Sequence, residues 1–189
     1  GGAGHGGAWP LAEASLADNV HGRPPGFCTG CPERPIFSAM KLVERELGAH
    51  HVSADIGCHL FSILPPFHIG NTTMGYGLGT AGASAFNSSP ALNTSAPKRA
   101  ISMMGDGGFW HNGLTSGIAN AVCNRSDNLT IVVDNNYTLA TGGQELLSSP
   151  AVHTSRVTGH AIERAVRGVS VEWVSTVKHT RDASATRAA

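Results

Sequence analysis

The sequence predicts an α/β fold in which a parallel sheet is flanked by helices. Short apolar runs typical of strands, at 51–56, 99–104, 129–133 and 171–177, alternate with segments of helical periodicity. The run at 129–133 is almost wholly apolar, a pattern typical of parallel strands buried on both faces. With 189 residues, of which 41% are hydrophobic and 14% charged, the chain is long enough for one domain with a packed core.

Helical periodicity predicts helices between and beside these strands. The first carries Ile36, Met40, Val43 and Leu47 at helical spacing and ends before Gly48, a common helix terminator. The second is rich in small residues, so we expect it to pack closely against a neighbouring element. The predicted helices cover 36–47, 74–86, 114–122 and 161–167, and the predicted loops cover 57–73, 87–97 and 134–155.

The predicted domain covers residues 21–180. Residues 1–20 begin with a Gly/Ala-rich stretch and are predicted to be a flexible lead-in. Residues 181–189 resemble a helix that starts at an Asp cap and is cut short. We therefore expect the chain to be a fragment whose domain is truncated at its C-terminal end.

Composition and charge argue against two classes of function. The formal net charge is zero, and no basic cluster is present to attract a nucleic acid. No apolar run approaches the ~20 residues needed to cross a bilayer, and no secretory signal is visible. The sequence therefore predicts a cytoplasmic protein that binds neither nucleic acid nor membrane.

Two oxygen-bearing residues stand just past the ends of predicted strands. Asp106 follows the run 99–104 within Gly-Asp-Gly, and Asn135 follows the run 129–133. Parallel strands joined by a helix end on the same edge of a sheet, so these two side chains are expected to converge there. A carboxylate, an amide oxygen and a backbone carbonyl are hard ligands suited to Mg²⁺, which leaves positions open for phosphate oxygens.

The glycines beside Asp106 favour a phosphate-bearing ligand at this edge. Gly105, Gly107 and Gly108 carry no side chain, so the backbone could approach a diphosphate closely. A helix beginning near Trp110 would add the positive end of its dipole. Either motif alone would be an ordinary turn, but their placement at two strand ends joined by a helix favours a functional site.

These stretches resemble a known family of enzymes. The segments ISMMGDGGFWHNGLTSGIANAV and TIVVDNNYTLATGGQ are similar to the thiamine-diphosphate signature of the 2-oxoacid:ferredoxin oxidoreductases, and within them to the α subunits of the indolepyruvate enzymes. The segments RPPGFCTGCPERPIFSAMKLVE, SADIGCHLFSILPPF and NTTMGYGLG add to the resemblance, which runs from about Arg23 to Val177.

The resemblance implies a thiamine-diphosphate-binding fold and gives particular residues a role. Asp106, Asn135 and the backbone carbonyl of Tyr137 resemble the Mg²⁺ ligands. The other residues expected to contact the cofactor are Gly57, Met74, Gly75, Gly105, Gly107, Gly108, Thr141 and Gly142. His111, which follows the glycine motif, is the candidate catalytic residue, and a histidine bonded to a neighbouring loop is the alternative.

Three cysteines form a candidate metal set. Cys28 and Cys31 lie in a Cys-x-x-Cys pattern within a Pro/Gly-rich loop, and Cys58 follows in Asp-Ile-Gly-Cys. Such spacing lets two sulfurs reach one metal while a third arrives from an adjacent loop. The resemblance implies a four-iron four-sulfur cluster whose fourth cysteine is absent from this chain, and zinc or a disulfide are the alternatives. Cys123 is predicted to lie in the core.

The activity implied by the resemblance is oxidative decarboxylation of a 2-oxoacid. The expected substrate is an aryl pyruvate, indolepyruvate first, with the acyl group passed to coenzyme A and electrons passed to ferredoxin. A pyrimidine-binding domain, which these residues lack, and a β subunit are the expected partners in an oligomer, so the fragment alone should be inactive. The alternatives are a non-oxidative thiamine-dependent decarboxylase or acetolactate-synthase-like lyase, and a non-catalytic magnesium- or nucleotide-binding module.

Overall fold

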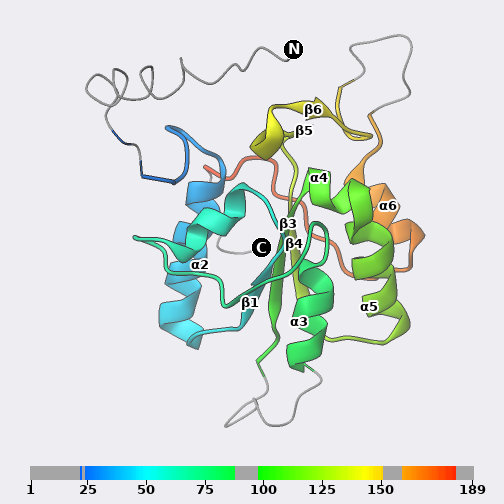
Figure 1. The fold of residues 1–189 in the computed structure, drawn as a ribbon. Coiled ribbons are helices and arrows are strands. Elements are labelled where there is room, and N and C mark those ends of the chain that lie inside the picture. The colour runs from blue at the N-terminus through cyan, green and yellow to red at the C-terminus, as the bar shows by residue number, and fades with distance from the viewer. Residues whose placement is uncertain (1–21, 23, 88–97, 151–158, 182–189) are drawn as a thin grey trace, which may run out of the picture.

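The computed structural model describes residues 22, 24–87, 98–150 and 159–181 and is built around one parallel sheet (Figure 1). Its strands are β1 (Val52–Ala54), β2 (Thr72–Thr73), β3 (Ile101–Gly105) and β4 (Leu129–Val133), in the order β2-β1-β3-β4. Every pairing between them is parallel. The predicted α/β class is therefore confirmed.

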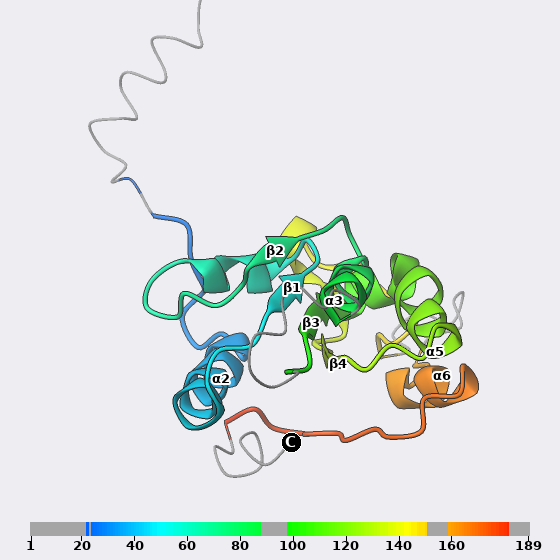
Figure 2. The ribbon, with the colours of Figure 1, turned by 90° about the horizontal axis from the view of Figure 1, so that it is seen from below.

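Helices cover the two faces of this sheet. α3 (Gly79–Asn87) packs on one face, and α2 (Glu33–Leu47) lies against the other, as Figure 2 shows. A Cβ at Gly79 would lie 2.9 Å from the carbonyl oxygen of Met103, so the close packing expected of this glycine-rich helix is confirmed. α6 (Ile162–Gly168) packs against the long helix that connects β3 to β4.

The two faces of the sheet carry different side chains because residues alternate in direction along a strand. On the α3 face the Thr80 hydroxyl lies 3.1 Å from Ser102 Oγ and 3.3 Å from Thr130 Oγ1. On the α2 face Phe37 joins apolar residues of the strands in the main core, which also includes Val52, Phe67, Ile69, Met103 and Val133. Small hydroxyl side chains thus allow α3 to approach, and large apolar ones fill the space beneath α2.

Two helices begin at positions other than those predicted. The helix expected at 74–86 begins at Gly79, because 72–73 pair as β2 and Gly77 adopts a φ of 77° in the turn that follows. The helix expected at 114–122 begins at Asp106. There α4 (Asp106–Gly108), η3 (Phe109–Ala119), which has the wider turns of a π-helix, and α5 (Asn120–Cys123) continue one another.

Three further expectations are wrong. Residues 171–177 form no strand and pair with no strand in the described part of the chain, although they run beside the sheet. β4 is not buried on both faces, because only Val133 is buried and the rest of the strand borders an open cavity. Cys123 is exposed, since it ends α5 where the chain turns away from the core.

The remaining predicted elements are close to those observed. The helices at 36–47 and 161–167 appear as α2 and α6, and the predicted loops also contain η1 (Cys58–Ile63), β2, and a hairpin of β5 (Tyr137–Thr138) and β6 (Gln144–Glu145). None of the described helices combines the length and apolarity that a membrane crossing requires. The predicted lead-in at 1–20 and the helix start at 182–189 lie outside the described residues.

Candidate active site

The carboxyl ends of β3 and β4 bring Asp106 and Asn135 together. Gly105 is in register with Val133, so the two strands stop at the same level and the chain leaves both at one edge. The backbone N–H of Asn135 donates a hydrogen bond to Asp106 Oδ2 at 3.1 Å. The two residues therefore lie in contact, as the strand order requires.

Asp106 is a buried carboxyl group in an unfavourable electrostatic position. It is 2% exposed, and its Oδ1 accepts a hydrogen bond from the Gly107 N–H at 2.8 Å. Burial and the neighbouring Asp134 carboxyl raise the pKa of Asp106 to about 6, against the opposing effect of the Gly107 and Asn135 N–H groups. A divalent cation would relieve the repulsion between the two carboxylates.

The donor set around Asp106 fits Mg²⁺. Asn135 Oδ1 accepts a hydrogen bond from the Tyr137 N–H at 3.3 Å, which places the Tyr137 backbone beside the amide. Asp106, Asn135 and Tyr137 all line one cavity of about 870 Å³. Carboxylate, amide and carbonyl oxygens are the ligands that this hard cation takes.

The cavity is formed by the strand ends, the start of η1, the Gly-Asp-Gly segment and the β5–β6 hairpin. Figure 1 shows the hairpin, which contains η4 (Leu139–Thr141), above α4. The expected site residues that line the cavity are Gly57, Cys58, Gly105, Asp106, Gly107, Gly108, His111, Asn135, Tyr137 and Thr141. The expected site residues that do not line it are Cys28, Cys31, Met74, Gly75 and Gly142. Tyr76, for which the sequence predicted no role, does line it.

The glycines of the motif differ in what surrounds them. A Cβ at Gly107 would fall on the hydroxyl oxygens of Tyr76 and Thr138, and a Cβ at Gly108 would fall on Asp55 Oδ2. Gly105 has no such neighbour within 4 Å. Internal packing therefore requires Gly107 and Gly108 to be glycines, whereas Gly105 leaves open space in which a ligand could approach the backbone.

Asp55, to which the sequence pattern assigned no role, joins three parts of this edge. It is fully buried after β1, its Oδ2 accepts a hydrogen bond from the Gly77 N–H at 2.8 Å, and its Oδ1 lies 2.5 Å from His59 Nε2. Burial opposes a charged His59 ring, but the hydrogen bond and charge of Asp55, together with Glu33, raise the His59 pKa overall. Asp55 thus fixes the turn at Gly77 and the start of η1 against β1.

Removal of the Asp55 carboxylate should destabilise the protein strongly. We expect Asp55→Ala to lower the free energy of unfolding by about 3 kcal/mol or more, because His59 and the Gly77 N–H lose a buried partner. Urea denaturation followed by circular dichroism measures this loss. Arg99→Gln is the control, because the Arg99–Asp127 ion pair is exposed and its removal should cost less than about 1 kcal/mol. Equal losses would contradict this role for Asp55.

The cysteines approach one another on the side of the cavity near Glu33. Burial and then the charges of Glu33, Cys31 and Cys28 raise the pKa of the Cys58 thiol. All three are free thiols in this structure. In the described parts of the chain, no group of three or more His, Cys, Asp or Glu side chains is arranged to hold a metal ion. The arrangement of the described residues therefore does not fit a preformed cluster site.

His111 and Tyr76 lie side by side at the cavity. His111 is exposed, and its ring centroid lies 5.1 Å from that of Tyr76. Burial raises the pKa of Tyr76, its hydrogen bond with Thr138 lowers it, and the charges of Asp55 and Asp106 raise it. No sequence pattern assigned a role to Tyr76 or Thr138, although the glycines on either side of Tyr76 were a usable signal of a tightly built turn.

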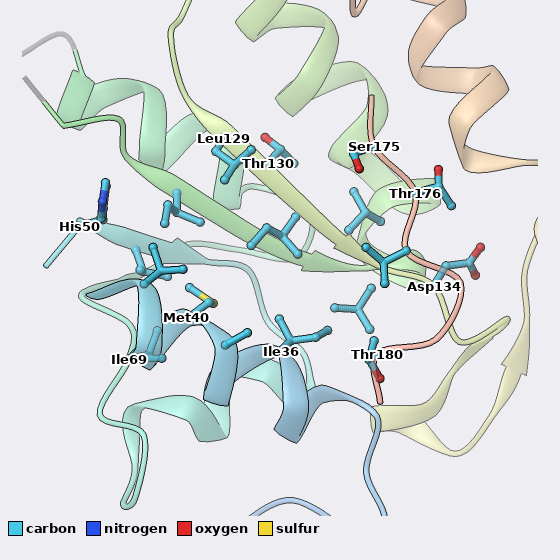
Figure 3. A pocket seen from close by; sticks show the side chains of 18 of the residues that line it. Ile36, Met40, His50, Ile69, Leu129, Thr130, Asp134, Ser175, Thr176 and Thr180 are labelled. Atoms are coloured by element: carbon cyan, nitrogen blue, oxygen red, sulfur yellow. The ribbon is translucent and has the colours of Figure 1, made fainter. Parts of the chain in front are cut away.

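A larger cavity of about 1350 Å³ lies between α2 and the face of the sheet that α2 covers (Figure 3). Ile36 and Met40 of α2 and Leu129 of β4 point into it, and the segment with Thr176 and Thr180 runs along its side. Its lining is mainly apolar, and neither Asp106 nor Asn135 contributes to it. The oxygen-bearing residues that could hold a metal ion therefore line the smaller cavity and not this one.

The parallel sheet and the Asp106 edge define a recognised class of domain. Residues 55–188 match the family described as thiamine pyrophosphate enzyme, C-terminal TPP binding domain. The chain belongs to this family of thiamine-diphosphate-binding domains.

Among individual proteins, the chain is similar to subunits of indolepyruvate oxidoreductases. The chain is 32% identical over 163 residues to indolepyruvate oxidoreductase subunit IorA of Methanothermobacter thermautotrophicus, a match covering 82% of this chain and 25% of that protein. It is 39% identical over 132 residues to the IorA subunit of Pyrococcus abyssi, covering 65% of this chain and 20% of that protein. The chain thus spans a quarter or less of the length of these two relatives.

A solved structure shares the fold. The 2-oxoglutarate:ferredoxin oxidoreductase from Magnetococcus marinus, determined with 2-oxoglutarate, coenzyme A and succinyl-CoA bound, superposes with a TM-score of 0.55. The match covers 74% of this chain and 47% of that chain at 20% sequence identity, so it is a likeness of fold alone.

Proposed function

We propose that this chain is the thiamine-diphosphate- and magnesium-binding part of a 2-oxoacid:ferredoxin oxidoreductase that acts on an aryl pyruvate, indolepyruvate first. The observation that carries the proposal is the hydrogen-bonded contact of Asp106 with Asn135 at adjacent strand ends, inside a glycine-lined cavity. The similarity to subunits named for indolepyruvate oxidoreductase supports the substrate. The reaction would give carbon dioxide, an acyl-CoA and electrons for ferredoxin.

The residues of the cavity would hold the cofactor through its diphosphate. Asp106, Asn135 and the Tyr137 carbonyl would hold Mg²⁺, and the N–H groups at the start of α4 favour phosphate oxygens. Thr141 and Gly142, in the β5–β6 hairpin, would close over the diphosphate. When bound, thiamine diphosphate supplies the nucleophilic carbon and the electron sink that decarboxylation of a 2-oxoacid needs.

Other groups complete the proposed site. His111 would face the substrate carboxylate or the reacting carbon, since it is exposed beside Tyr76 at the cavity. A pyrimidine-binding domain and a β subunit would complete an oligomeric assembly in the cytoplasm. The chain alone should therefore not turn over substrate.

Activity of the assembled protein tests this proposal. It is prepared anaerobically with thiamine diphosphate and Mg²⁺ and supplied with indolepyruvate, coenzyme A and a viologen dye. We expect dye reduction and acyl-CoA formation that both depend on coenzyme A. Aldehyde formation without dye reduction would assign a non-oxidative decarboxylase. A protein that binds no thiamine diphosphate would leave the magnesium- or nucleotide-binding alternative.

Iron analysis tests the cluster that the sequence resemblance implies, against the observation that the cysteines form no preformed metal site in the described residues. Wild type and Cys58→Ala are compared for iron, sulfide and thiamine-diphosphate content after anaerobic reconstitution. Loss of iron with unchanged thiamine would support a cluster held by this domain. Equal iron contents would place the redox centres elsewhere in the assembly.

A further inference from the structure

Glu33 is a carboxylate that none of the roles above uses. It is the first residue of α2 and follows closely after Cys31, yet it is only 4% exposed. It lines the same cavity as Asp106 and His111. Its Oε2 atom is buried and has no hydrogen-bond partner among the described residues.

Such an atom is costly to the protein. Leaving a buried acceptor without a donor costs about 1–3 kcal/mol, and buried polar groups in folded proteins are nearly always paired. The N-terminus of α2 favours a negative charge at this position but leaves Oε2 without a hydrogen bond. An unpaired acceptor on a residue that lines a cavity therefore points to a donor supplied by a ligand in that cavity.

Two neighbouring titratable groups, His59 and Asp55, contact each other and form no hydrogen bond with Glu33 Oε2. His59 Nε2 lies 2.5 Å from Asp55 Oδ1 and 3.0 Å from the Asp55 carbonyl oxygen, so this ring nitrogen is committed to Asp55. Both residues are close enough to act on Glu33 through space: burial raises the Glu33 pKa, His59 lowers it and Asp55 raises it. Proximity without a hydrogen bond leaves Oε2 available to a ligand.

We propose that Glu33 Oε2 accepts a hydrogen bond from an N–H or O–H donor on the molecule that occupies the cavity, and thereby helps to select that molecule. This inference rests on the proposed function, because it takes the cavity to be the cofactor and substrate site. The donor could belong to the amino-bearing ring of the cofactor or to the substrate side chain, such as an indole N–H. A cavity of about 870 Å³ lies within the size range of small-molecule sites.

Two substitutions separate binding from packing. Glu33→Met keeps a similar length and removes both carboxylate oxygens, whereas Glu33→Gln keeps one acceptor oxygen. Wild type and both variants of the assembled protein are compared by thermal unfolding without ligand and by fluorescence titration with thiamine diphosphate in Mg²⁺. The third measurement is kcat/KM for indole-3-pyruvate and for its N1-methyl analogue, which lacks the ring donor.

We expect Glu33→Met to keep or increase the thermal stability, because it removes a buried carboxylate whose Oε2 atom has no hydrogen-bond partner in the described part of the chain. Its affinity for whichever ligand supplies the donor should fall by about tenfold or more, and Glu33→Gln should restore much of it. Weaker binding of thiamine diphosphate would assign the donor to the cofactor. Unchanged cofactor binding with loss of the preference for indole-3-pyruvate over the N1-methyl analogue would assign it to the substrate.

Three outcomes would overturn the inference. Glu33→Met could bind the cofactor and discriminate between the two substrates as the wild type does. It could lose thermal stability while both binding properties stay unchanged, which would assign Glu33 to internal packing. A wild type that binds no thiamine diphosphate would remove the proposed function itself, and that failure is seen before any variant is compared.

Discussion

Asp106→Asn is expected to abolish Mg²⁺-dependent binding of thiamine diphosphate while changing the stability of the ligand-free protein only slightly. A neutral amide is a much weaker Mg²⁺ ligand than a carboxylate, so we expect the affinity to fall by about 100-fold or more. The pKa of Asp106 is raised to about 6, so at neutral pH the ionised group is less favourable in the folded than in the unfolded chain. Removing that charge favours the folded chain, but the asparagine has only one acceptor oxygen for the two N–H groups of Gly107 and Asn135. The two effects oppose each other, so we expect the Tm to change by less than about 4 °C.

Isothermal titration with thiamine diphosphate in Mg²⁺, and thermal unfolding without ligand, measure the two effects. Asp134→Asn is the control, because Asp134 also contributes to the repulsion but lies exposed and outside the proposed ligand set. It should raise the Tm, because it removes the repulsion and leaves both N–H bonds to Asp106 in place, and it should lose little cofactor affinity. An Asp106→Asn protein that binds the cofactor within a few-fold of wild type would refute the proposed metal site.

Gly108→Ala is expected to destabilise the fold, whereas Gly105→Ala in the same motif should fold as the wild type does. A methyl group at Gly108 would fall on Asp55 Oδ2, which cannot withdraw because it is held by the Gly77 N–H. Forcing an atom into such a packed site costs about 3 kcal/mol, and complete failure to fold would be the extreme of the same effect. Gly105 has a φ of −80°, and a methyl group added to it would have no neighbour within 4 Å, so an alanine there meets neither strain nor a clash.

Thermal unfolding and cofactor titration of both variants test this difference. If the diphosphate approaches the backbone at Gly105, Gly105→Ala should bind thiamine diphosphate more weakly at unchanged stability. Equal destabilisation by the two substitutions would contradict the distinct surroundings described for these glycines.

Much of the fold follows from local sequence patterns. The α/β class, β4, α2 and α6 were predicted because each element carries its own periodicity and its own end signals. The contact of Asp106 with Asn135 was also predictable, since parallel neighbouring strands must end on one edge. The glycine motif itself predicted a site, although it assigned all three glycines the same role.

Other features depend on partners that are distant in the sequence. Residues 171–177 have a strand-like composition, but a strand exists only where a neighbour accepts its hydrogen bonds, and β4 has no such pairing on its outer edge in the described residues. The helix expected to start at residue 74 starts later, because pairing of β2 with β1 holds 72–73 extended. Strand pairing therefore decided both cases: 171–177 form no strand because they lack a pairing partner in the described residues, and 72–73 form a strand because they have one.

By itself, the sequence determined the fold class, the position of the strand ends and the oxygen ligands gathered there, because these follow from short-range periodicity and from the direction of parallel strands. Only the tertiary structure decided which buried groups surround them. It placed Asp55 against Gly108 and Gly77, exposed Cys123, and left Oε2 of Glu33 without a hydrogen-bond donor from the residues that the structure describes. The reason is that burial and hydrogen bonding depend on contacts between distant segments, which no local pattern records.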